Sequence, residues 1–126
     1  MVNVCKMRGS VLKDRDFWFV VRMVNLYKYL CEGRKEFVMS KQILRNGTSV
    51  GAMIREAEFS ESIDDFIHKM AIVQKEINET MFWLKVFKET KYIITNEFES
   101  IHTDAVEIIK MITSSIKTAK SKKTNH

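Results

Sequence analysis

The chain has no proline and only 4 glycines among its 126 residues. Average usage would supply about six prolines to a chain of this length. Because proline and glycine destabilise the interior of a helix more than other residues do, their scarcity favours long, uninterrupted helices. The length is typical of one domain with a single core, so we expect residues 1–126 to form one domain.

The chain also lacks long apolar segments. No apolar run approaches the roughly 18 residues that a membrane-spanning helix needs, and no apolar segment follows the basic N-terminus as it would in a secretory signal. Of the 2 cysteines, Cys5 lies near the N-terminus and Cys31 among apolar residues, and neither has a partner that would activate it. These absences predict a reduced, cytoplasmic protein that does not bind membranes.

Residues with catalytic or metal-binding chemistry are few and scattered. Of the 3 histidines, His102 alone stands in a Glu-x-x-His sequence, with Glu99. A di-iron bundle site requires two such motifs, so the histidines do not predict one. Gly47 and Gly51 do not form a phosphate-binding loop, because no Gly-Lys-Ser/Thr sequence follows them. No acid and base can be paired for catalysis. We therefore predict that the protein is not an enzyme and has no catalytic residues, cofactor, metal site or small-molecule substrate.

Four helices are predicted from apolar residues that recur at three- and four-residue steps and from polar residues at helix starts. Their approximate ranges are 16–32, 36–58, 62–90 and 96–117. Gly33 stands where a glycine commonly ends a helix in the left-handed conformation. Because the connections are short, we predict an all-α fold, an antiparallel up-and-down four-helix bundle. The pattern stops there, and residues 118–126 are predicted to be a disordered basic tail.

The first predicted helix carries apolar residues on nearly every side. A helix of this kind is buried by more than one neighbour, which indicates contacts beyond a single bundle. We therefore expect the protein to bind copies of itself, and the aromatic residues Phe17 and Trp18 are candidates for that contact.

The second predicted helix contains a run of small residues in a chain of mostly long side chains. The run comprises Gly47, Thr48, Ser49, Gly51 and Ala52. A spacing of four places Gly47 and Gly51 on one helical face, with Thr48 and Ala52 beside them. Small side chains let a second helix approach closely, so we predict a helix-packing motif rather than a cradle for a ligand.

The formal net charge of +5 is unevenly distributed. Residues 1–15 contribute +3 and residues 117–126 contribute +4, which leaves −2 for the residues between them. Basic flanks on a near-neutral body are typical both of solubilising tails and of arms that bind nucleic acid.

Three cations of the second predicted helix form a candidate nucleic-acid-binding face. At about 100° per residue, Lys41, Arg45 and Arg55 fall within an arc of roughly 80°. Such a face would neutralise the phosphates of RNA or DNA, above all if an oligomer brought several copies together. The alternative is a solvated stripe whose cations pair with Glu56 and Glu58.

The segment Arg45–Ala57, RNGTSVGAMIREA, is followed by an acidic helix start and by the dipeptide Phe66-Ile67. Together with the preceding Val38–Leu44 and with Glu79–Leu84 downstream, it resembles the four-helix-bundle proteins encoded in intervening sequences of bacterial 23S ribosomal RNA genes. The resemblance spans nearly the whole chain.

This resemblance implies a bacterial protein that forms a closed cylindrical homopentamer of four-helix bundles. A related protein, the accessory protein of diversity-generating retroelements, is a basic barrel that binds nucleic acid and a reverse transcriptase. The resemblance implies no known catalytic activity and supplies no binding residues. We therefore predict a non-enzymatic homo-oligomer, a pentamer, whose partners are RNA, DNA, a ribonucleoprotein or a nucleic-acid-processing protein. The alternative is a protein-interaction scaffold that binds no nucleic acid.

Overall fold

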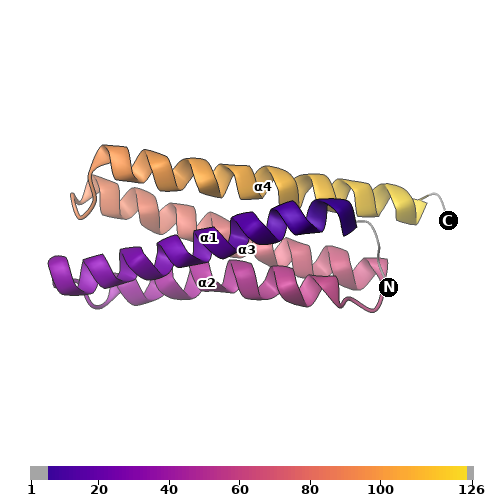
Figure 1. The fold of residues 1–126 in the computed structure, drawn as a ribbon, viewed down its shortest axis with the longest axis horizontal. Helices are drawn as coiled ribbons and strands as arrows, with labels where there is room; N and C mark the ends of the chain where they lie inside the picture. The colour runs from indigo at the N-terminus through magenta and orange to yellow at the C-terminus, as the bar shows by residue number, and fades with distance from the viewer. Residues whose placement is uncertain (1–5, 125–126) are drawn as a thin grey trace.

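The computed structural model describes residues 6–124 and is built from four helices. They are α1 (Lys6–Lys28), α2 (Met39–Glu58), α3 (Ile63–Glu89) and α4 (Thr95–Thr124). Figure 1 shows them side by side in one bundle, with each helix running back along the one before it. The prediction of an all-α four-helix bundle is confirmed.

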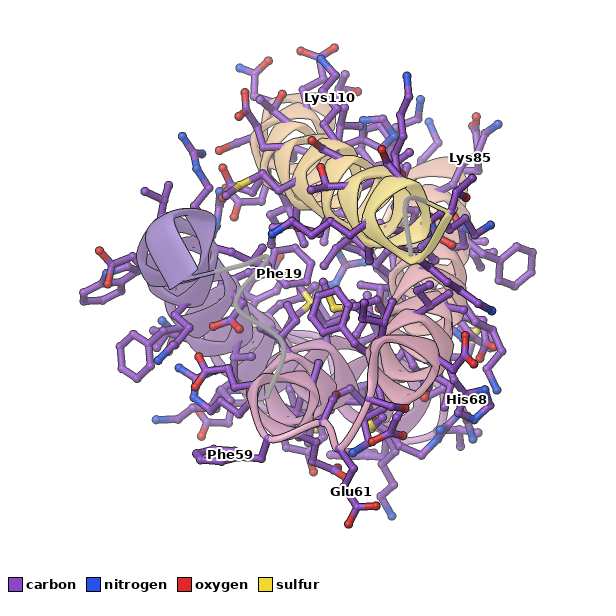
Figure 2. All side chains as sticks on the ribbon, turned by 90° about the vertical axis from the view of Figure 1, so that its right-hand side faces the viewer. Phe19, Phe59, Glu61, His68, Lys85 and Lys110 are labelled. Carbon is purple, nitrogen blue, oxygen red and sulfur yellow. The ribbon has the colours of Figure 1, made fainter. Side chains whose placement is uncertain are left out.

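The helices do not contact one another equally. Consecutive helices pack along their length, whereas α1 and α4 contact each other much more sparsely. The large, fully buried side chains include Phe19, Met23, Leu30, Ile43, Met70, Ile77, Leu84, Phe87, Ile101, Ile108 and Ile112. Viewed along the bundle in Figure 2, Phe19 points from α1 into this core. The core therefore lies along the bundle axis, and the α1 and α4 pair closes it most loosely.

α1 begins at Lys6, well before the start near residue 16 that the sequence predicted. The additional turns are held to the bundle because Leu12 is buried in the core. Next to it, Lys13 Nζ lies 2.6 Å from Glu58 Oε1 of α2. These turns were not predicted, because basic residues interrupt the apolar spacing there.

α4 is helical to the end of the described chain. The prediction of disorder over residues 118–126 is therefore wrong, except that residues 125–126 lie outside the described part. Ala119 is fully buried, and Lys123 Nζ lies 2.5 Å from Asp64 Oδ1 at the start of α3. A small residue thus continues the apolar face of α4, and an ion pair connects its last turn to α3.

The end of α1 also differs from the prediction. The helix passes into a π-helical turn, Tyr29–Gly33, and no described glycine has a positive φ. Lys35 adopts the left-handed conformation instead, with φ 56°, and Lys91 does the same after α3, with φ 66°. A Cβ makes this conformation unfavourable, which is why glycine usually occupies it. Both connections at this end of the bundle therefore have lysine where glycine is expected.

Carboxylates and a hydroxyl stabilise the starts of α2 and α3. Glu36 is buried, and its carboxylate accepts hydrogen bonds from the backbone N–H groups of residues 38–40 at distances from 2.7 to 3.3 Å. Burial acts to raise the pKa of Glu36, but these hydrogen bonds outweigh it and lower the pKa. At α3, the Ser62 hydroxyl accepts from the Asp65 N–H at 3.0 Å, and the Asp65 carboxylate accepts from the Glu61 N–H at 3.2 Å. Side chains thus satisfy the N–H groups of residues 38–40 at the start of α2 and that of Asp65 in the first turn of α3.

Candidate nucleic-acid interface

Gly47 and Gly51 lie where α2 crosses α1. A Cβ on Gly47 would stand 2.3 Å from Met23 Cγ and 2.8 Å from its Sδ. A Cβ on Gly51 would stand 2.7 Å from Val20 Cγ2. Because non-bonded carbons keep about 3.5–4.0 Å apart, a larger residue at either position would force α1 or its side chains to move. The two glycines therefore set the separation of the helices.

Ala52 does not belong to this crossing, because it is exposed. Thr48 and Ser49 are half-buried, and their hydroxyls donate to carbonyl oxygens of their own helix. Thr48 Oγ1 lies 2.7 Å from Leu44 O, and Ser49 Oγ lies 2.7 Å from Arg45 O. The predicted packing motif is thereby reduced to its two glycines within the subunit.

Arg55 is paired with α1. Its Nη1 lies 2.9 Å from Oδ1 and 3.0 Å from Oδ2 of Asp16, whose side chain is fully buried. Burial raises the pKa of Asp16, and the hydrogen bond and charge of Arg55 offset this only in part. Arg55 therefore neutralises a buried carboxylate rather than standing free for a phosphate.

Arg45 is exposed but lies beside carboxylates of α3. Its guanidinium is 3.9 Å from Glu76 Oε2 and 3.9 Å from Glu79 Oε1. The neighbouring Asn46 is fully buried, and its Nδ2 donates to the same two glutamates at 2.8 Å each. This polar bridge between α2 and α3 was not predicted. An asparagine on the apolar face of a helix is the signal that could have revealed it.

Lys41 is the remaining member of the predicted three-cation face. It is exposed, and no carboxylate pairs with it within the described residues. The structure therefore does not bring Lys41, Arg45 and Arg55 together as a free cationic face, since the last two contact carboxylates of α3 and α1.

A second cationic region lies where α1 connects to α2 and α3 connects to α4. We call it the loop end and define it as residues 28–41 and 88–97. It contains six lysine or arginine residues and four carboxylates. Lys28, Lys35 and Lys91 are exposed, and none of them has an ion pair in the part of the chain that the structure describes. Figure 1 shows both connections at the same end of the bundle.

Arg34 joins the two connections of the loop end. Its Nη1 donates to the carbonyl oxygens of Lys91 and Tyr92 at 2.9 and 3.1 Å. Its guanidinium carbon also lies 5.0 Å from the centre of the Tyr92 ring. Because carbonyl groups and rings carry no net charge, the positive charge of Arg34 is not cancelled. The loop end is thus a connected surface with an excess of positive charge.

A hollow of about 490 Å³ opens between α1 and the start of α4 at the loop end. Leu26 and Ile93, both buried, form its apolar floor. Tyr29 and Ile94 line it as well and are exposed. This composition is typical of a binding pocket, which is mostly apolar with a few polar groups.

Polar residues form one wall of the hollow. Arg22 Nη1 lies 2.8 Å from Asp104 Oδ2 and 2.9 Å from Ser100 Oγ. Its Nη2 lies 3.3 Å from Glu97 Oε1. Asn25, one turn further along α1, also lines the hollow and is exposed. The guanidinium is therefore fixed against α4, and the Asn25 amide faces solvent.

Exposed apolar side chains are concentrated on α1. Four of the ten exposed large apolar residues in the described chain lie on this helix, more than on any other element: Val11, Phe17, Trp18 and Val24. The Phe17 and Trp18 rings contact each other edge to face, with centroids 5.2 Å apart. Trp18 also lines a smaller hollow of about 190 Å³ beside α4. The sequence signal for this surface is the occurrence of apolar residues on nearly every side of this helix.

Other classes of site find no support within residues 6–124. No helix there is long and apolar enough to cross a membrane, and no group of three or more histidine, cysteine, aspartate or glutamate side chains is placed to hold a metal ion. Cys31 is free and half-buried, and Cys5 lies outside the described residues.

Comparison with known proteins places the chain in a family. The sequence profile of the family described as 23S rRNA-intervening sequence protein matches residues 12–114. The chain belongs to this family. A crystal structure of a protein with unknown function from the S23 ribosomal protein family of Bacteroides thetaiotaomicron VPI-5482 has a similar fold, with a TM-score of 0.86 and 54% sequence identity. The similarity covers 88% of this chain and 99% of that one. No curated protein matches the sequence.

Membership of the 23S rRNA-intervening sequence protein family confirms the resemblance that the sequence analysis identified. The matched residues include both packing glycines, the Asp16–Arg55 pair and the whole loop end, and they end before the last turns of α4. The packing glycines, the buried ion pair and the loop end therefore all lie within the residues that the family profile matches.

Proposed function

We propose that this member of the 23S rRNA-intervening sequence protein family is a non-enzymatic homo-oligomer, a pentamer, that binds nucleic acid or a ribonucleoprotein. The observation that carries the oligomer is the exposed apolar surface of α1. Phe17 and Trp18 are 50% and 63% exposed in the single subunit. Apolar surface of this kind marks interaction sites in soluble proteins.

Support for nucleic-acid binding comes from charge. The chain has a sequence pI of about 9.2, and the loop end carries lysines that no carboxylate neutralises within the described residues. Cations of this kind bind phosphates by releasing counterions. An oligomer multiplies each such surface and with it the attraction for a polyanion.

The alternative is a protein-interaction scaffold that does not bind nucleic acid. One observation favours it: Arg45 and Arg55, two of the three cations first predicted to bind phosphate, contact carboxylates of the same subunit. Under this alternative the remaining lysines keep the oligomer soluble.

Native mass spectrometry at micromolar concentration tests the oligomer. We expect five times the 14.8 kDa mass of the chain. Trp18→Glu should yield smaller species, because it places a charge in the apolar contact. Phe82→Glu is the matched control, since Phe82 is exposed to a similar degree, 59%, but lies on α3. A wild-type protein that is monomeric under these conditions would refute the oligomer.

Gel shifts with RNA and with DNA across a salt series test nucleic-acid binding. We expect affinity to fall steeply as salt rises. Replacing Lys117, Lys120 and Lys122 by Gln removes charge from α4 without shortening it, and it should weaken binding only modestly. If the wild-type protein binds neither nucleic acid at low salt, the scaffold takes the place of the nucleic-acid-binding module.

A further inference from the structure

We propose that the hollow at the loop end binds one unpaired base of a single-stranded nucleic acid, while the cations around it hold the neighbouring phosphates. This inference rests on the proposed function, because it names the form of nucleic acid and the place where it binds. It also moves the binding surface from the outer face of α2 to the end of the bundle.

The size and lining of the hollow suit a nucleobase. Its volume of about 490 Å³ exceeds what one side chain fills and leaves room for a base with its sugar. Leu26 and Ile93 provide an apolar floor. Tyr29 is 48% exposed and offers a ring on which a base can stack. Stacking of this kind carries much of the affinity of proteins for single strands.

The polar wall suits the edge of a base. The Asn25 amide is exposed, and its donors and acceptor have no partner within residues 6–124, so it can pair with both kinds of group on a base. Glu97 adds an acceptor, and Arg22 is held in place by its contacts with α4. In a duplex the pairing edges are occupied by the opposite strand. An unpaired base presents them freely, so this wall favours single strands.

The local backbone positions the Tyr29 ring. Tyr29 opens the π-helical turn and Gly33 closes it. A Cβ on Gly33 would lie 3.3 Å from Tyr29 Cδ1, so the ring packs directly over this glycine. π-Helical turns are rare and occur frequently at functional sites. The turn therefore holds the aromatic ring at the mouth of the hollow.

The surrounding charge suits phosphates. Lys28 follows Asn25 by one turn of α1, and Lys91 precedes the Ile93 floor by two residues. Arg34 is bonded to the carbonyl oxygen of Lys91, so its charge lies at the same connection. A bound strand would thus meet three cations around a pocket that takes one of its bases.

A second copy of the chain is the competing occupant. Residues 55–65, at the opposite end of the bundle, contain one cation and five carboxylates and could meet the loop end of another subunit. That segment offers the apolar ring of Phe59 together with acidic side chains, whose charge would meet the Glu97 carboxylate on the wall of the hollow. A base carries no charge and presents both donors and acceptors, so the wall formed by Asn25 and Glu97 favours the base.

The test measures binding of fluorescein-labelled 12-nucleotide single strands, RNA and DNA, by anisotropy. We expect the intact protein to prefer single strands over matched duplexes. An otherwise identical strand with abasic sites should bind about tenfold more weakly. Tyr29→Ala should weaken binding of the intact strand by about tenfold and have little effect on the abasic strand, whereas Tyr29→Phe keeps the ring and should bind normally.

Further variants separate the base from the phosphates. Ile94→Ala should weaken binding as well, and because Ile94 is 71% exposed, this variant tests the hollow with little risk to folding. The double variant Lys28→Gln, Lys91→Gln should reduce the slope of log affinity against log salt by about 1.4, because each phosphate contact to a single strand contributes about 0.7. Lys85→Gln is the matched control on α3 (Figure 2), and it should change neither the affinity nor the salt slope.

Each contrary result has a distinct meaning. If the intact protein binds nucleic acid but Tyr29→Ala and Ile94→Ala bind as tightly as it does, the hollow is not the site and the proposed function stands. Equal affinity for duplex and single strand overturns the inference too. If Tyr29→Ala lowers the oligomer mass together with the affinity, the hollow receives a second copy instead. Absence of all binding by the intact protein refutes the proposed function itself.

Discussion

Helix α1 meets its two neighbours in different ways. Toward α2, glycines bring the backbones close together, and the buried Asp16 pairs with Arg55. Toward α4, two hollows separate the helices and Arg22 reaches across to half-exposed carboxylates. The first flank is fixed by close steric fit and a buried charge, and a solvent-accessible ion-pair network holds the second. The subunit therefore determines the position of α1 mainly through α2 and leaves the α4 flank open to a partner.

Enlarging a packing glycine should have the largest effect on stability. We expect Gly47→Leu to lower the free energy of unfolding by about 3 kcal/mol and Gly51→Leu by about 2 kcal/mol, because both overpack the crossing. Urea denaturation measures these changes. Ala52→Leu is the control on the same helix and should stay within about 0.5 kcal/mol of the wild type, since Ala52 is exposed. Similar losses in all three variants would contradict a crossing set by the glycines.

Replacing Arg55, the partner of the buried Asp16, should have the next largest effect on the free energy of unfolding. We expect Arg55→Met to cost about 2 kcal/mol at pH 7, because Asp16 would remain buried and unpaired. Burial raises the pKa of Asp16 in the folded protein. A carboxyl group of this kind contributes most to stability when it is protonated, below its unfolded pKa of about 4. That contribution is lost as pH rises through the folded pKa. The deficit of the variant should therefore shrink as pH falls. Denaturation at pH 7 and pH 4 tests this, and adding Asp16→Asn should restore stability at pH 7. A deficit independent of pH would exclude this explanation.

Glu36 should show the opposite dependence on pH. Its pKa is lowered by the hydrogen bonds from the start of α2, which outweigh burial. The ionised Glu36 carboxylate therefore adds to the stability of the protein above its unfolded pKa of about 4.3. This added stability is lost as pH falls through the folded pKa. We expect Glu36→Gln to cost about 1 kcal/mol at pH 7 and progressively less in acid. Thermal unfolding of both proteins at a series of pH values would show this, and parallel curves would count against it.

A substitution on the α4 flank of α1 should have the smallest effect on the free energy of unfolding. We expect Arg22→Met to lower the free energy of unfolding by about 0.5 kcal/mol, because its carboxylate partners are 43% and 52% exposed and such pairs contribute little. Urea denaturation at low and at high salt measures the effect, and salt should abolish it. A loss as large as that of Arg55→Met would show that the two flanks of α1 are held equally well.

The sequence predicted the elements of this fold better than their ends. Apolar residues at three- and four-residue steps record which face of each helix is buried, and this is why the four helices were found. The last turns of α4 were missed because the residue that continues its buried face there is Ala119. Alanine marks a buried face less clearly in a sequence than a larger apolar residue does. Gly33 was misplaced because a π-helical turn shifts the left-handed residue to Lys35.

The candidate site was less predictable because it depends on contacts between distant residues. Gly47 and Gly51 were identified as packing residues from their spacing alone. Their neighbour Arg55 was grouped with Lys41 by helical angle, yet its partner Asp16 is 39 residues away in the chain. Helical periodicity places a side chain on a face but does not say which charge the adjoining helix brings to it. The hollow at the loop end likewise combines α1 with the start of α4, which no local pattern indicates.

The left-handed lysines lower the stability of this end of the molecule and raise its charge. After α3, the N–H groups of Lys91 and Tyr92 donate to the carbonyl oxygens of Lys88 and Phe87 at 3.0 and 2.9 Å, a pattern whose left-handed position glycine usually fills. A lysine there costs about 1 kcal/mol relative to glycine, and Lys35 bears the same cost. Both connections therefore retain an ammonium group against the preference of the backbone. Replacing either lysine by glycine would make the chain more stable and less charged, so at these two positions stability and charge are opposed.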